Sequence, residues 1–160
     1  MNALISNVVV AISGSDASIN AAKYAILLSK AYECKVTAVY VVDTATLRQL
    51  LLTKIFIEEE SREYEESLQA NGRRYLQFVS SLAQDKGVII QTELRNGAIY
   101  TEVLKAAEEH KAEIILLGGW ESRRDQRDSI SIAHREILHH ARCSVLIVKE
   151  RDIEALFKRT

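Results

Sequence analysis

Five short runs of apolar residues recur along the chain, each rich in valine and isoleucine and with little polar alternation. The runs are Val8–Ile12, Val36–Val42, Val88–Ile90, Ile114–Leu117 and Val145–Val148. Strands covered on both faces, as in parallel sheets, show this pattern because neither face meets water. The pattern therefore predicts five buried strands.

The segments between these runs carry apolar residues at helical spacing, so each is predicted to contain helix. The spacing rests on Ala22, Ile26 and Leu27; on Tyr64, Leu68, Tyr75, Val79 and Leu82; on Ile99, Val103, Leu104 and Ala107; and on Ile130, Ala133, Ile137 and Leu138. Ser15 and Asp16 are suited to cap the first helix. Alternating strands and helices predict one doubly wound α/β domain with a parallel sheet flanked by helices.

The segment between the second and third strands, Thr44 to Asp85, is too long for one ordinary helix. We expect a short helix or loop near Thr46–Ile57 and then a longer helix through the acidic stretch Glu58–Glu66. Charge runs usually serve solubility, so these glutamates are interpreted as a solvated helix face.

Composition and charge describe an ordinary globular protein. Hydrophobic residues make up 48% of the 160 positions and charged residues 27%, with a net charge of -1. This balance offers no electrostatic reason for a nucleic acid or an anionic membrane as partner. The N-terminus does not read as a signal peptide, and no apolar stretch approaches the ~20 residues that span a bilayer. We expect a cytoplasmic protein in which Cys34 and Cys143 are buried, reduced thiols.

Small and polar residues follow the predicted strands, at the edge where open parallel sheets bind their ligands. Glycine lets backbone amides approach a ligand, and helix N-termini favour anions. Gly14 and Gly97 are equally consistent with ordinary turns. The candidate positions are Ser13, Gly14, Ser15 and Asp16; Asp43 and Thr44; Asn96 and Gly97; and Gly118, Gly119 and Trp120.

The stretch from Gly118 to Asp128 has the least usual composition. Arg123, Arg124 and Arg127 could clamp a phosphate or carboxylate through forked hydrogen bonds. Three acidic residues of the same stretch balance them, so a self-paired surface loop is the alternative. Trp120 would either stack on a ligand or partner, or pack half-buried.

Motifs for catalysis or metal binding are not recognisable in this sequence. It contains no P-loop, no G-x-S-x-G elbow, no G-x-G-x-x-G fingerprint and no zinc-type cysteine spacing. His134, His139 and His140 do not align on one helix face as metal ligands would. We therefore expect neither an enzyme nor a metal site.

Five pieces of the chain, in order, resemble the universal stress protein family. Val8–Ser15 resembles its opening strand, which usually ends in an Ala-Val-Asp-Gly-Ser type sequence. Ala38–Asp43 looks like its second strand, and Asn96-Gly97 like a strand-to-helix turn. Ala112–Gly118 is similar to Ala-Asp-Leu-Ile-Val-Met-Gly, and Ala141–Val148 to Ala-Pro-Cys-Pro-Val-Leu-Val-Val. The resemblance implies a five-stranded parallel sheet of the adenine nucleotide alpha hydrolase-like type, in one domain over residues 1–149 with a C-terminal extension over 150–160.

The phosphate end departs from the ATP-binding members of that family, which carry Gly-x-x-Gly after the fourth strand and later a glycine followed by serine or threonine. Gly118 matches the first glycine, but Glu121 replaces the second, and Ser131 and Ile132 replace the later pair. Ser13 replaces the aspartate of the first strand. A carboxylate would repel phosphate, and isoleucine has no hydroxyl to offer it. Ordinary triphosphate binding is therefore not expected.

Other parts of the family pocket are retained. Val41 and Asp43 resemble its adenine-side wall, while Gly118, Gly119, Ser129 and Ser131 keep small or hydroxyl groups. Ser129 or Ser131 would either bond an anion at the start of the fourth helix or simply cap that helix.

These features lead to one functional expectation and two main alternatives. We expect a stress-response regulator that acts mainly through protein contacts, including a regulatory protein partner, and does not depend on tight ATP binding. The first alternative is a sensor that holds ATP, AMP or a cyclic nucleotide in a divergent pocket; the second is a slow ATP hydrolase. On topology alone, an electron-transfer flavoprotein-like or other adenine-binding protein is a further analogy.

The end of the chain bears on assembly. In many family members the last strand pairs with its copy, which implies a homodimer through Val145, Leu146, Ile147 and Val148. The extension carries Ile153, Leu156 and Phe157 at helical spacing. It would pack across the dimer, dock on a partner helix, or remain a frayed tail.

Overall fold

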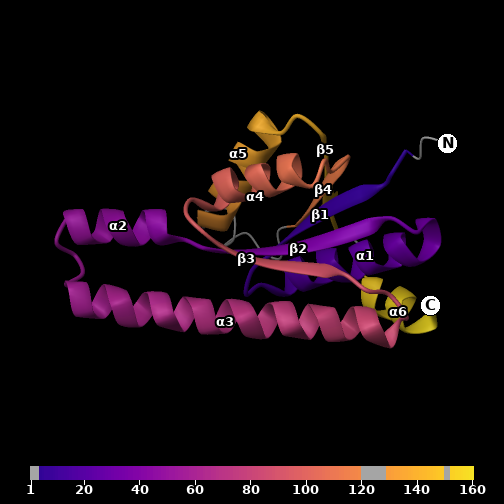
Figure 1. Ribbon diagram of the computed structural model, residues 1–160, viewed down its shortest axis with the longest axis horizontal. Helices are drawn as coiled ribbons and strands as arrows, with labels where there is room; N and C mark the ends of the chain where they lie inside the picture. Colours follow the sequence, from indigo (N-terminus) through magenta and orange to yellow (C-terminus); the bar gives the residue numbers. More distant parts are fainter. Residues whose placement is uncertain (1–3, 120–128, 150–151) are drawn as a thin grey trace.

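The computed structural model describes residues 4–119, 129–149 and 152–160, which form a parallel sheet between layers of helices (Figure 1). The strands are β1 (Asn7–Ile12), β2 (Lys35–Val42), β3 (Gln91–Asn96), β4 (Ile114–Gly118) and β5 (Ser144–Val148). The helices are α1 (Asp16–Tyr32), α2 (Thr44–Leu52), α3 (Glu58–Asp85), α4 (Ile99–Glu109), α5 (Ser129–His140) and α6 (Ile153–Arg159). The predicted alternation of strands and helices is confirmed.

The order of strands in the sheet is β3-β2-β1-β4-β5, and every pairing is parallel. The chain first adds β2 and β3 on one side of β1, and then returns to add β4 and β5 on the other side. The carboxyl ends of β1 and β4 therefore meet where the direction of winding reverses. Open α/β sheets bind their ligands at such a switch point.

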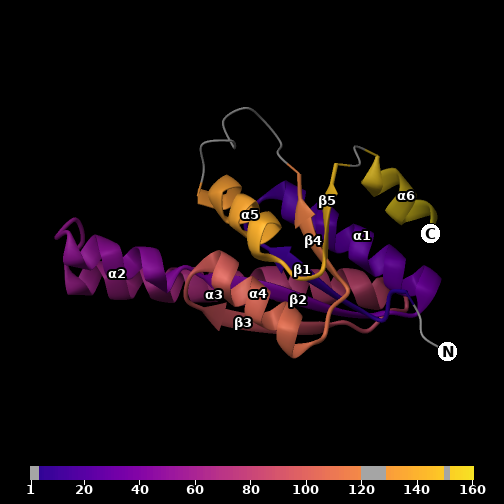
Figure 2. The same ribbon diagram turned by 90° about the horizontal axis from the view of Figure 1, so that it is seen from above.

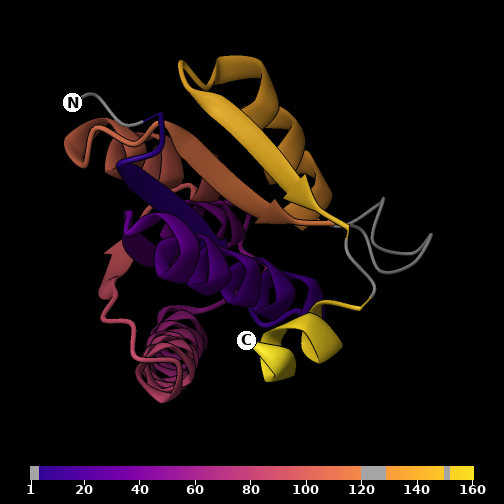
Figure 3. The same ribbon diagram turned by 90° about the vertical axis from the view of Figure 1, so that its right-hand side faces the viewer.

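Two apolar cores lie on opposite faces of the sheet. Val8, Val10 and Ile26 belong to the core under α1 and α3, whereas Val9, Ile115 and Ile137 belong to the core under α4 and α5. Figure 3 shows these two helical layers on either side of the strands. Alternating residues of β1 thus enter different cores, which explains why this strand is apolar from Val8 to Ile12.

The third strand was predicted at the wrong residues. The apolar run Val88–Ile90 leads into the sheet, while β3 itself is the polar segment Gln91–Asn96 that pairs with β2. β3 is an edge strand, and only Leu94 adds to the core under α3. Towards α4, Arg95 donates hydrogen bonds to Glu93, Glu102 and Glu109 instead. A prediction based on apolar residues alone therefore placed this strand at the wrong positions.

The segment between β2 and β3 forms two helices, as predicted. α2 and the first turns of α3 extend side by side beyond the sheet, and only the later part of α3 covers it (Figures 1 and 2). Five of the six predicted surface glutamates are exposed and Glu65 is half-buried. Among the helices of the described segments, none is long and apolar enough to cross a membrane.

The C-terminal extension docks on its own chain, which none of the sequence-based alternatives anticipated. α6 packs against α1, with Ile153 and Phe157 buried (Figure 2). Lys23 of α1 donates a 3.1 Å hydrogen bond to Glu154, and Lys30 Nζ donates to the carbonyl oxygen of Thr160 at 2.7 Å. The extension is thus an integral helix of the fold.

Candidate functional site

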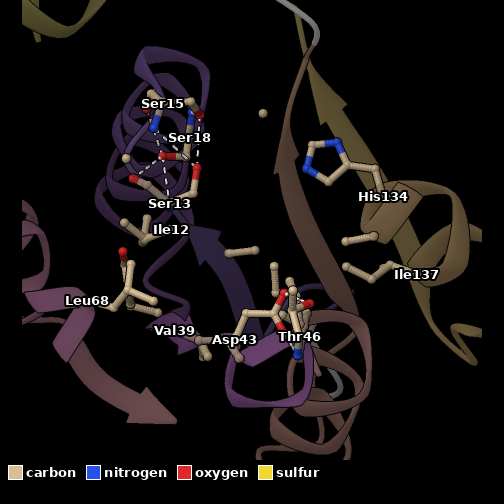
Figure 4. A pocket seen from close by; sticks show the side chains of 18 of the residues that line it. Ile12, Ser13, Ser15, Ser18, Val39, Asp43, Thr46, Leu68, His134 and Ile137 are labelled. Carbon is tan, nitrogen blue, oxygen red and sulfur yellow. Dashed lines mark hydrogen bonds between the residues drawn. The ribbon is translucent and has the colours of Figure 1, made fainter. Parts of the chain in front are cut away.

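A cavity of about 540 Å³ opens at the carboxyl ends of β1, β2 and β4, at the switch point of the sheet. Figure 4 shows residues from α1, α2, α3 and α5 around it. Of the predicted ligand-binding residues, six line this cavity: Ser13, Gly14, Val41, Asp43, Gly118 and Gly119. Residues that lie far apart in the sequence are therefore brought into one pocket.

Three serines form one wall of the pocket. Ser15 is the N-cap of α1, as predicted, and its hydroxyl accepts a 3.2 Å hydrogen bond from the amide of Ser18. The hydroxyl of Ser18 donates to the carbonyl oxygen of Ser13 at 2.9 Å, and the hydroxyls of Ser13 and Ser15 lie 3.0 Å apart. These bonds fix the loop between β1 and α1 and place uncharged hydroxyl groups on this wall of the pocket.

Asp43 lies at another side of the pocket, at the start of α2. Its carboxylate accepts hydrogen bonds from the amide of Thr46 at 3.0 Å and from the hydroxyl of Thr46 at 2.7 Å. The negative charge thus caps a helix N-terminus, where the helix dipole also stabilises it. Asp43 positions α2 against the pocket and is already engaged as an acceptor.

Two adjacent glycines line the pocket at the end of β4. A Cβ atom on Gly118 would lie 2.5 Å from the carbonyl carbon of Ala17, and one on Gly119 would lie 2.9 Å from the carbonyl oxygen of Val148. Both positions therefore require glycine for close approach of backbones. Gly97, by contrast, does not line this pocket; its φ of 143° serves the turn from β3 to α4.

His134 is a pocket residue that the sequence analysis missed. Figure 4 shows its imidazole across the cavity from Ser15 and Ser18. Burial lowers the pKa of His134, so the ring is neutral at neutral pH. Its spacing of three residues before the buried Ile137 was the available signal, since it places both on one helix face.

The burial of His134 predicts that acid will destabilise the fold. Below the ordinary histidine pKa of about 6.5, the unfolded chain binds a proton that the folded chain resists, so the free energy of unfolding falls. Between about pH 7 and pH 5, we expect the free energy of unfolding to fall less in His134→Gln than in the wild type. Urea titrations across that range would measure it, with exposed His139→Gln as the control. Equal pH profiles for wild type and His134→Gln would contradict the prediction.

Apolar residues of α2, of α3 and of the turn between them complete the pocket and were also missed. Leu47, Leu50, Phe56, Tyr64 and Leu68 line its side away from β4. Their segment has no polar signature that could announce a site, and only the tertiary fold brings it over the strand ends. No lysine or arginine is found among the described residues that line the pocket. The predicted clamp, Arg123, Arg124 and Arg127, and the side chains of Ser129 and Ser131 lie outside the described residues.

Sheet order and pocket position define this chain as a doubly wound α/β protein with a ligand-binding cavity at its switch point. The chain belongs to the universal stress protein family, whose sequence model matches residues 5–149. A universal stress protein of Methanocaldococcus jannaschii is 31% identical over 147 residues, which cover 92% of this chain and 84% of that protein.

Solved structures show the same fold. A universal stress protein of Lactobacillus plantarum superposes with a TM-score of 0.74 at 21% identity, covering 92% of this chain and all of that one. A family member from Arabidopsis thaliana, whose structure contains bound AMP, superposes with a TM-score of 0.64 at 17% identity; the match covers 93% of this chain and 94% of that one. The predicted family and fold class are confirmed.

Proposed function

We propose that this protein is a regulator that acts through protein contacts and binds an adenine nucleoside or its monophosphate, rather than ATP, in the pocket at the switch point. The observation that carries the proposal is a cavity of about 540 Å³ with uncharged polar groups on its walls. That volume lies within the usual range of roughly 300–1,000 Å³ for small-molecule sites. The AMP bound to the Arabidopsis thaliana protein is of the same ligand class.

The charges around the pocket favour a ligand with little phosphate. Asp43 contributes a negative charge, His134 is neutral, and lysine and arginine are absent from the described lining. Each further phosphate would bring negative charge that these groups do not neutralise, and desolvating an unpaired charge is costly. Apolar walls and serine hydroxyls suit a base and a ribose better.

The proposal involves no reaction. Hydrolysis of a phosphate ester needs a positioned base or metal, and we assign Asp43 the role of capping α2 instead. We also propose a cytoplasmic location, which suits the free cysteines Cys34 and Cys143. In this view ligand occupancy would alter which protein contacts form.

Calorimetric titration of the purified protein with adenosine, AMP and ATP tests the proposal. We expect AMP to bind at least about tenfold more tightly than ATP, a difference of ~1.4 kcal/mol. Ser13→Leu should abolish AMP binding because the larger side chain enters the pocket, whereas Ser81→Leu on the outer surface of α3 should not. Absence of adenosine and AMP binding to the wild type would refute the ligand proposal.

The alternative sensor, in which arginines clamp the phosphates, makes the opposite prediction. ATP would then bind at least as tightly as AMP. Replacing Arg123, Arg124 and Arg127 by alanine would reduce the affinity for ATP more than that for AMP, because forked hydrogen bonds to phosphate would be lost. Our proposal expects the same triple substitution to leave AMP affinity within about twofold of wild type.

We further propose a homodimer through the free edge of β5. Within the described part of the chain β5 pairs with β4 alone, and the amide of Ser144 donates to the carbonyl oxygen of Glu113 in the neighbouring segment. Because the N–H groups of successive residues in a strand point to opposite sides, the amides of Val145 and Ile147 point towards the free edge. Such an edge invites pairing with a second copy.

Ile147→Pro is expected to convert the dimer into a monomer, because proline removes an N–H from this edge without breaking a bond to β4. Light scattering coupled to size-exclusion chromatography would measure the mass. Ile147→Ala is the control: it loses the same side chain from the core but keeps the amide, and should remain dimeric. A monomeric wild type, or a dimeric proline variant, would contradict this arrangement.

A further inference from the structure

The turn between α2 and α3 exposes more apolar surface than its place in the fold requires. Leu52, Ile55, Ile57 and Tyr64 are between 50% and 76% exposed. We call these four residues the α2–α3 tip. Turns in such positions usually carry polar residues, and exposed apolar clusters commonly mark interaction sites.

The turn at the tip is held in a defined conformation. The amides of Ile55 and Phe56 both donate to the carbonyl oxygen of Leu50, at 2.9 and 3.2 Å. The ring of Phe56 packs edge-on against Tyr64, with centroids 5.9 Å apart. The apolar side chains are thus presented outwards by a hydrogen-bonded turn, a preorganisation that lowers the entropic cost of binding.

The described part of the chain does not cover the tip. α2 buries Leu47 alone, and α2 with the start of α3 projects past the sheet (Figures 1 and 2). The sheet and both cores are complete without these side chains. The two cores therefore do not require apolar residues at these four positions.

The charge around the tip indicates the kind of partner. Residues 44–66 carry six glutamates against three basic residues, Arg48, Lys54 and Arg62, hence a net charge of -3 in a chain whose total is -1. The helix dipole explains acidic residues in the first turn of α3, but Glu63, Glu65 and Glu66 lie beyond that turn. An apolar tip within an acidic surround complements a surface that is apolar and basic.

We propose that the α2–α3 tip docks a basic amphipathic helix of a partner protein, with leucine-like side chains on Leu52, Ile55 and Ile57 and lysine or arginine facing the glutamates of α3. A second copy is disfavoured because two-fold contact would bring the same acidic surround face to face. An anionic membrane would be repelled for the same reason. The inference rests on the proposed function only in taking the protein to be a regulator. It does not require the protein to bind a nucleotide.

The test uses the full-length protein and a labelled synthetic peptide of about 18 residues, or five helical turns, with leucines on one face and lysines on the other. A peptide with glutamate in place of lysine is the first control. Fluorescence anisotropy should show binding of the basic peptide that weakens as salt is added. The combined substitution Leu52→Gln, Ile55→Gln and Ile57→Gln should weaken binding at least about tenfold.

Two further variants separate the apolar and acidic contributions. Glu63→Gln and Glu66→Gln, two exposed positions beyond the first turn of α3, together should weaken binding and flatten its salt dependence. Ile89 lies outside the α2–α3 tip and is 91% exposed, so the Ile89→Gln variant should bind the basic peptide like the wild type. No binding of the basic peptide, equal binding of the acidic one, or unchanged binding by both multiple variants would overturn the proposal.

Self-association and nucleotide binding give independent readouts. If the three glutamine substitutions in the tip reduce the mass of the protein in solution, the tip binds a second copy and the proposal is wrong. None of Leu52, Ile55 and Ile57 lines the pocket, so this variant should retain AMP affinity. Loss of peptide binding with AMP binding intact supports the docking site; absence of AMP binding in all variants refutes only the ligand proposal.

Discussion

Gly118→Ala is expected to destabilise the protein by about 2–3 kcal/mol, because no space exists for a methyl group at this position. The added Cβ would lie 2.5 Å from the carbonyl carbon and oxygen of Ala17 and 2.7 Å from the amide nitrogen of Ser18. These are backbone atoms at the start of α1, which cannot rotate away as a side chain would. Relief requires α1 to move from β4, and this movement would also distort the pocket.

Urea unfolding of the wild type and the variant measures the loss, and calorimetry with AMP measures the effect on the pocket. Gly14→Ala is a matched control: the atom nearest to its Cβ would be the hydroxyl oxygen of Tyr75, at 3.4 Å, which is an ordinary contact with a side chain. We expect the control to cost less than about 1 kcal/mol. A Gly118→Ala protein as stable as the control would show that α1 and β4 are not in such close contact.

Phe157→Ala is expected to cost about 2–3 kcal/mol, because Phe157 anchors α6 to the rest of the fold. Its ring is 6% exposed and belongs to the core under α1. The ammonium groups of Lys23 and Lys86 lie 5.8 and 4.6 Å from its centroid, which adds cation–π attraction. α6 has only seven residues, so without this anchor we expect it to undock rather than collapse into the space.

Hydrogen exchange of the α6 amides, together with urea unfolding, measures the undocking. Leu156→Ala is the matched control on the same helix, since Leu156 is exposed, and should change stability by less than about 1 kcal/mol. The loss in Phe157→Ala should not depend on protein concentration, because α6 packs on its own chain. A concentration-dependent loss would instead place α6 on a neighbouring copy, as one of the sequence-based alternatives supposed.

The candidate site could be predicted in part. Ser13 and Asp43 were found because they follow apolar runs, and the ends of parallel strands share one edge of a sheet. His134 and the wall formed by Leu50 and Phe56 were missed. Their side chains belong to helices, or to the turn between α2 and α3, that reach the strand ends only through tertiary packing, and an apolar wall residue has the same sequence pattern as a core residue.

The alternation of strands and helices, the cap at Ser15 and the membership of the chain in its family could all be predicted from the amino-acid sequence. These properties depend on burial patterns and hydrogen bonds between near neighbours, which recur with the period of each element. The position of β3, the docking of α6 on α1 and the exposure of the α2–α3 tip could not be predicted in this way and became evident in the folded chain. Each depends on contacts between residues distant in sequence, and such contacts leave no periodic signal: an edge strand can be polar, and an apolar turn can face solvent.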